Sequence, residues 1–245
     1  MKLRYLLTFF LCVLFICMVP TNIIYSESAD TFSKKLEARG YKINYEKKIG
    51  GVPYRITADS RTKVENDDFL LICSIPTITT IKFEKVTFPE KISEHINACA
   101  EKKINRVIFS DTDISKELIC EISKLKGISE LSFRNANLNN QSLECLSSIK
   151  QIDLIDLLGV KNSFDDEGFC KFAKSPIKIR SLGMYESYLG KQGYDCLLDF
   201  QTLESISVRK WKNFSKEQMD AIALLYSKKY GKKIIIDSFD YDRPK

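Results

Sequence analysis

One spacing of apolar residues recurs along most of this chain. In ISELSFRNANL, residues 128–138, apolar side chains stand at the first, fourth, sixth, ninth and eleventh positions. The fourth and sixth alternate as in a strand, because successive strand residues point to opposite faces of a sheet. Beyond Asn140, apolar residues fall three and four apart, as on one face of a helix. The pattern predicts a strand that leads into a helix.

The same unit repeats at intervals of 21 to 30 residues, with copies that start near residues 51, 78, 104, 128, 149, 179, 203 and 231. The second copy carries Ile78, Ile81 and Phe83, and the fifth is assigned to Ile149, Ile152 and Leu154. A single unit of this size buries too few side chains to offset the entropy of ordering it. The copies are therefore expected to stack, each one covering the flanks of the next.

The spacing resembles the pattern L-x-x-L-x-L-x-x-N/C-x-L of leucine-rich repeat proteins, nearest the ribonuclease-inhibitor-like and cysteine-containing kinds, over residues 51–239. The resemblance implies an α/β solenoid of about seven or eight units, with helices on the convex side. Strands about 4.8 Å apart pack more closely than helices about 10 Å wide, so a curved parallel sheet lines the concave side. Residues 29–50 form an N-terminal cap in this interpretation, and residues 240–245 a C-terminal tail.

The first 28 residues have the layout of a secretory signal peptide. Lys2 and Arg4 precede an apolar run from Leu6 to Val19, and small polar residues follow. The run is shorter than the roughly 20 residues of a membrane-spanning helix. We expect cleavage, a mature start near Ala29, and a secreted or extracytoplasmic protein without a stable membrane span. An uncleaved anchor and lipid attachment at Cys17 are the alternatives.

The charge does not indicate nucleic acid as a partner. Removal of residues 1–28 lowers the formal net charge from +6 to +5, and the lysines are scattered among carboxylates. The sequence contains no phosphate-binding glycine-rich loop and no metal-ligand motif, so we expect neither cofactor nor metal. Asn140 and Asn213 are glycan acceptors only if the protein passes through a eukaryotic secretory pathway. The oligomeric state is not fixed by the sequence.

Six cysteines follow the predicted signal peptide, at steps of 26, 21, 25, 25 and 26 residues: Cys73, Cys99, Cys120, Cys145, Cys170 and Cys196. An even number in an exported chain is typical of disulfides. However, neighbouring helices lie about 8 to 10 Å apart, whereas a disulfide needs α-carbons within about 7 Å. This comparison favours buried thiols that pack as small apolar residues. Disulfides, a metal site, and a nucleophilic Cys99 with His95 as its base remain alternatives.

The strand positions that face solvent are the expected binding surface. Tyrosine and arginine, which dominate binding hot spots, occur there beside carboxylates. The candidate partner-binding residues are Arg134, Asp153, Asp156, Tyr185, Glu186, Arg209 and Lys210. We expect a protein-binding module and not an enzyme. The alternative is an exported hydrolase that uses a carboxylate pair such as Asp153 and Glu186.

Overall fold

The computed structural model describes residues 21–46, 51–159, 161–185, 189–209 and 215–238, and side chains from residue 29 on except those of residues 185, 209, 237 and 238. These residues form one nine-stranded sheet whose strands follow one another in chain order. Every pair of neighbours is parallel except the first, because β1 runs antiparallel to β2. The strands are β1 (Lys42–Glu46), β2 (Val52–Ala58), β3 (Thr80–Glu84), β4 (Arg106–Ser110), β5 (Glu130–Arg134), β6 (Gln151–Leu158), β7 (Lys178–Tyr185), β8 (Ser205–Arg209) and β9 (Ile235–Ser238).

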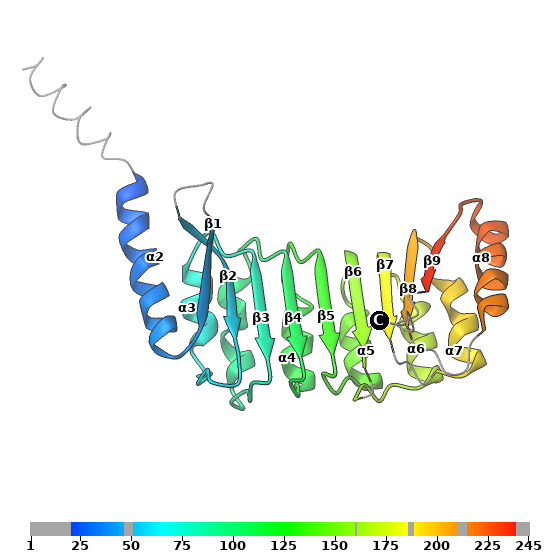
Figure 1. The fold of residues 1–245 in the computed structure, drawn as a ribbon, viewed down its shortest axis with the longest axis horizontal. Coiled ribbons are helices and arrows are strands. Elements are labelled where there is room, and N and C mark those ends of the chain that lie inside the picture. Colours follow the sequence, from blue (N-terminus) through cyan, green and yellow to red (C-terminus); the bar gives the residue numbers. More distant parts are fainter. Residues whose placement is uncertain (1–20, 47–50, 160, 186–188, 210–214, 239–245) are drawn as a thin grey trace, which may run out of the picture.

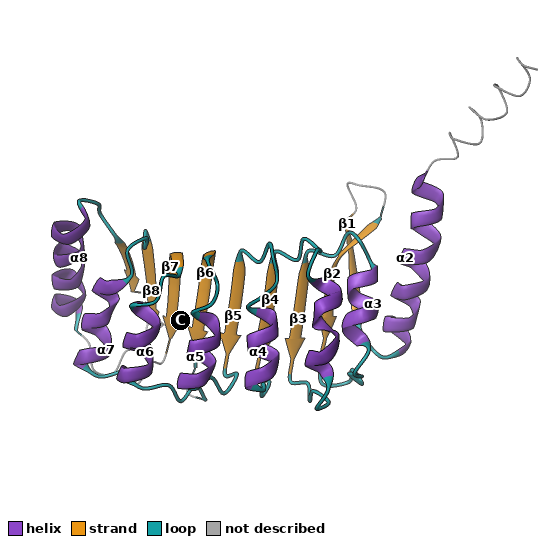
Figure 2. Cartoon of the chain, turned by 180° about the vertical axis from the view of Figure 1, so that it is seen from behind, coloured by secondary structure: helices purple, strands orange, loops and turns teal. Residues whose placement is uncertain are grey.

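Helices alternate with the strands and cover one face of the sheet (Figures 1 and 2). They are α2 (Thr21–Ala38), α3 (Asp68–Ser74), the 3₁₀ helix η2 (Ile92–Cys99), α4 (Lys116–Ile122), α5 (Asn140–Leu146), α6 (Asp166–Ala173), α7 (Lys191–Asp195), the 3₁₀ helix η3 (Cys196–Asp199) and α8 (Lys216–Tyr230). The predicted α/β class and mostly parallel sheet are confirmed. The arrangement is compatible with a solenoid.

The core lies between the sheet and its helices. Each parallel strand directs its alternating apolar residues toward the helices, and neighbouring strands align these residues in register. Phe83 and Phe133 each stack on Phe109, with ring centroids 5.5 and 5.7 Å apart. Because one repeat position supplies all three rings, the repeat spacing itself builds the continuous core.

The strand assignment of the fifth repeat copy is wrong. Ile155 and Leu157 of β6 pair with Leu131 and Phe133 of β5, whereas Leu154 lies on the opposite face of the sheet. The L-x-x-L-x-L spacing therefore begins at Ile152, three residues after the predicted start. Copies that begin at residues 78, 104, 128, 152, 179 and 203 are more evenly spaced than predicted.

The expected preference for free thiols is also wrong. Disulfides join Cys73 to Cys99, Cys120 to Cys145, and Cys170 to Cys196. The paired α-carbons lie 5.1, 4.8 and 5.2 Å apart. The 8–10 Å between packed helices joins their axes, and each α-carbon lies about 2.3 Å from its own axis. α-Carbons that face one another across two such helices can therefore come within about 5 Å.

Side-chain caps and a glycine define several helix ends. Ser215 and Gln218 form a capping box, and Gly231 ends α8 in the left-handed conformation with φ 68°. Asn139 caps α5, and Asp165 caps α6 by accepting a hydrogen bond from the Gly168 N–H. This N–H and the Asn140 amide hold the pKa of Asp165 below its ordinary value.

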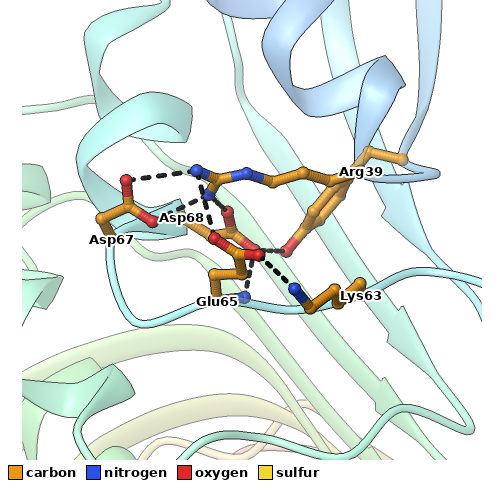
Figure 3. Close-up of polar contacts among 6 residues, drawn as sticks. Arg39, Lys63, Glu65, Asp67 and Asp68 are labelled. Atoms are coloured by element: carbon orange, nitrogen blue, oxygen red, sulfur yellow. Dashed lines mark hydrogen bonds and ion pairs between the residues drawn. The ribbon is translucent and has the colours of Figure 1, made fainter.

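A charge cluster around Asp68 links the chain between α2 and β1 to α3 (Figure 3). Asp68 is 1% exposed and accepts hydrogen bonds from Arg39, from the Tyr41 hydroxyl at 2.5 Å and from the Glu65 N–H at 2.8 Å. Burial and the bond to Asp68 raise the pKa of Tyr41. Arg39 also contacts Asp67 at 2.8 Å, and this bond holds the pKa of Asp67 below its ordinary value.

The predicted domain boundaries stay predictions. α2 and β1 occupy much of the segment assigned to the N-terminal cap, residues 29–50. Most of the predicted signal peptide, residues 1–20, and the C-terminal tail, residues 240–245, lie outside the described residues. Within the described part of the chain, no helix combines the length and apolar character needed to cross a membrane.

Candidate binding surface

The open face is the face of the sheet opposite the helices, and in-register pairing arranges its side chains in rows. The central row contains Lys82, Ile108, Ser132, Asp156, Gly183 and Ser207. The row toward the carboxyl ends of the strands contains Glu84, Ser110, Arg134, Leu158, Tyr185 and Arg209. The row toward their amino ends includes Arg106, Glu130, Leu154, Ser181 and Ser205.

Asp156 is a carboxyl group in the central row of the open face, and its pKa is raised. Burial raises its pKa, and a hydrogen bond with Ser132 and the positive charges of Arg106 and Arg134 oppose this effect. Its neighbour in the row is Gly183, where an added Cβ would overlap the Asp156 carboxylate. The absence of a side chain at position 183 therefore leaves space that the carboxylate occupies.

Most other charges of the open face are paired within the chain. Arg106 forms an ion pair with Glu130, and the Lys82 amine lies 2.6 Å from the Glu84 carboxylate. Arg134 differs, because it is exposed and forms no ion pair or hydrogen bond with another described side chain. An exposed guanidinium beside a half-buried carboxyl group offers both a donor and an acceptor to an incoming molecule.

The structure brings some predicted site residues together and separates one. Asp156 and Arg134 lie on adjacent strands, and the backbones of Tyr185 and Arg209 continue the row of Arg134. Asp153 lies three residues before Asp156, about 10 Å along the strand, and forms an ion pair with Arg180 at 3.7 Å. The side chains of Tyr185 and Arg209, and all of Glu186 and Lys210, lie outside the described residues.

Sequence reasoning missed Arg106, Glu130 and Gly183. Arg106 and Glu130 were missed because only the positions between and after the alternating apolar residues of each strand were considered. Gly183 was missed because it carries no side chain. Arg106 and Glu130 occupy the position directly before Val107 and Leu131, and parallel pairing sets them side by side. Their equal position in the repeat and opposite charges were a usable signal.

The alternative sites considered for catalysis and metal binding can be compared with the structure. Cys99 is bonded to Cys73, so the nucleophile–base pair of Cys99 with His95 is wrong for the oxidised protein. Among the described residues, no group of histidine, cysteine and carboxylate side chains could hold a metal ion. The expectation that the protein is not an enzyme stays a prediction.

Comparison of the sequence with models of known protein families and with curated proteins found no match. The case for a function therefore rests on the fold and on the open face.

Proposed function

We propose that the protein is an exported binding module of leucine-rich repeat type, which recognises a protein partner through the open face of its sheet. The proposal includes curvature, with the open face on the concave side, because strands pack more closely than helices. Nine in-register strands supply a broad surface, and the described helices leave this face to solvent.

The observation that carries the proposal is the pair of Arg134 and Asp156. The raised pKa of Asp156 means that its ionised form is disfavoured where it stands. A sheet face that served only to stay hydrated would need no half-buried carboxyl group. Groups that cost stability and lie on an accessible surface are concentrated at functional sites. Arginine is also among the residue types that dominate binding hot spots.

Export is supported by the disulfides. Three of them link neighbouring helices, and such bonds persist in oxidising compartments outside the cytosol. The apolar run from Leu6 to Val19 fits this location as a signal peptide. The disulfides and the apolar run therefore favour an extracellular or envelope protein as the partner that binds the open face.

The experiment is affinity capture from extracellular and envelope extracts with immobilised protein that starts at Ala29. Arg134→Glu reverses the charge at the centre of the open face. Lys116→Glu is the matched control, because Lys116 is exposed on α4, on the helix-covered side. We expect Arg134→Glu to weaken capture at least about tenfold while the control retains it.

Stability is measured in parallel, so that loss of capture cannot come from unfolding. Arg134→Glu should lower the melting temperature by no more than about 3 °C, since the exposed side chain makes no ion pair or hydrogen bond and the new charge only adds repulsion with Asp156. Gly183→Ala tests the same site through Asp156 and not through Arg134, because the added methyl group must displace the Asp156 carboxylate. Capture of the same partner by wild type and Arg134→Glu with equal affinity would overturn the proposal.

A further inference from the structure

The outer side of α8, the last described helix, carries a stripe of exposed apolar and charged residues. Ile222 and Tyr226 on the inner side of the helix are buried, and Tyr230 donates a hydrogen bond to the Leu198 carbonyl at 2.8 Å. Leu224 lies on the opposite side and is 57% exposed, whereas Leu225 lies on the flank of the helix and is 49% exposed. The last described helix therefore presents two leucines to solvent.

The residues of this stripe are arranged symmetrically along the helix. Glu217, Ala221, Leu224 and Lys228 are all exposed and lie at intervals of four, three and four residues. At 100° per residue they form one line along the outer side of the helix. Reversing the helix direction exchanges Glu217 with Lys228 and Ala221 with Leu224. The stripe is therefore complementary to an antiparallel copy of itself.

We propose that the protein forms a homodimer in which α8 packs antiparallel against α8 of a second copy. Leu224 of each copy lies against the small Ala221 of the other, and Glu217 of each pairs with Lys228 of the other. A two-fold axis produces both contacts twice, as an isologous interface requires. The mixed charge argues against an anionic surface as the occupant, since Glu217 and Asp220 would be repelled by it.

One pair of 15-residue helices buries less area than a standard stable interface, so the dimer is expected to be weak. Sedimentation velocity on the purified protein at concentrations up to about 0.5 mM covers the range of such affinities. We expect the sedimenting mass to rise toward twice that of the monomer as the concentration increases.

Two single variants test the register. Glu217→Lys places two lysines at each charged contact, and Lys228→Glu places two glutamates there, so each variant alone should remain monomeric. In an equimolar mixture both contacts of the mixed pair are again lysine with glutamate. We expect the mixture to dimerise although neither component does.

Glu144→Lys on α5 is the control and should dimerise as wild type does, because Glu144 is exposed away from α8. Circular dichroism checks that both α8 variants are folded, since each reverses a favourable charge at a helix end. The proposal is overturned if the wild-type protein stays monomeric. It is equally overturned if either single variant dimerises as well as wild type, or if mixing restores nothing.

Discussion

The two ends of the sheet are finished in different ways. At the N-terminal end, antiparallel β1 covers the edge of β2, and Asp68 is enclosed by Arg39, Tyr41 and the Glu65 N–H. At the C-terminal end, α8 covers the core with the side that carries Ile222 and Tyr226, and it exposes Leu224 and Leu225 to solvent. One end is closed by polar contacts within the chain, whereas the other keeps an apolar surface.

The difference shows that a terminal element can cover the core and still leave an apolar surface of its own exposed to solvent. A repeat unit relies on its neighbours, so terminal units must replace the neighbour that is missing. The cluster around Asp68 does so with charge. α8 replaces the missing neighbour only on its inner side, which is why its outer stripe is available to a second copy in our proposal.

The largest expected effect comes from opening the N-terminal end. Asp68→Ala leaves Arg39 and the Tyr41 hydroxyl without their buried acceptor, so we expect the free energy of unfolding to fall by about 4 kcal/mol. Urea denaturation measures this. Asp30→Ala is the control, because Asp30 and Lys34 form an exposed ion pair whose loss should leave the free energy of unfolding close to that of wild type. Equal losses for both variants would mean that the cluster does not hold the cap.

The next effect concerns the disulfide nearest that end. Replacing Cys73 and Cys99 together by serine frees a loop with a sequence separation of 26, so we expect a loss of about 3 kcal/mol. None of the three disulfides of the described chain reaches α8. Reduction of the wild-type protein should therefore lower hydrogen-exchange protection between β2 and β8. The protection of α8 should fall less than that of these strands. Unchanged stability in the double variant would contradict a stabilising bond between Cys73 and Cys99.

A smaller effect is expected at the C-terminal end. Ser215→Ala removes the side chain that accepts a hydrogen bond from the Gln218 N–H at 3.3 Å. Loss of a helix N-cap costs about 1 kcal/mol. Thermal unfolding should show the decrease, and Ser215→Asp should restore most of it. If Ser215→Ala lowered the free energy of unfolding as much as Asp68→Ala does, the two ends would not differ in how strongly their contacts stabilise the fold.

The smallest effect lies between the ends, on the open face. The folded-state pKa of Asp156 is raised above its unfolded value, so its ionisation reduces stability as the pH rises through that folded pKa. Asp156→Asn should therefore be slightly more stable than wild type at pH 7, and the advantage should disappear in acid, below the unfolded pKa. Urea denaturation at several pH values measures the difference. A variant less stable than wild type at pH 7 would show that the charged carboxylate contributes favourable contacts instead.

The repeat spacing predicted the interior of the fold because apolar positions must coincide when strands pair in register. Phe83, Phe109 and Phe133 were placed correctly for this reason. The spacing failed in β6, where Ile149, Ile152 and Leu154 match it as well as Ile152, Ile155 and Leu157 do. Only the pairing with Leu131 and Phe133 decides between the two sets.

The candidate site was predictable in part. Arg134 followed from strand alternation after Phe133. Asp156 was named from the wrong register, in which alternation from Ile152 and Leu154 would turn it toward the core, and its contact with Gly183 depends on which residues of β6 and β7 pair. The cluster around Asp68 had no sequence signal, since Arg39 lies 29 residues away along the chain. The disulfides were missed because the distance between helix axes was compared with a limit for α-carbons.

The most direct test of the central claim is photo-crosslinking from the two sides of the sheet. A photoreactive residue at Ser132 lies on the open face beside Asp156, and one at Glu144 lies on α5 on the helix-covered side. In extracellular or envelope extract, we predict a discrete crosslinked protein from position 132 and none from position 144. The same product from position 144, with none from position 132, would place recognition on the helices and contradict the account.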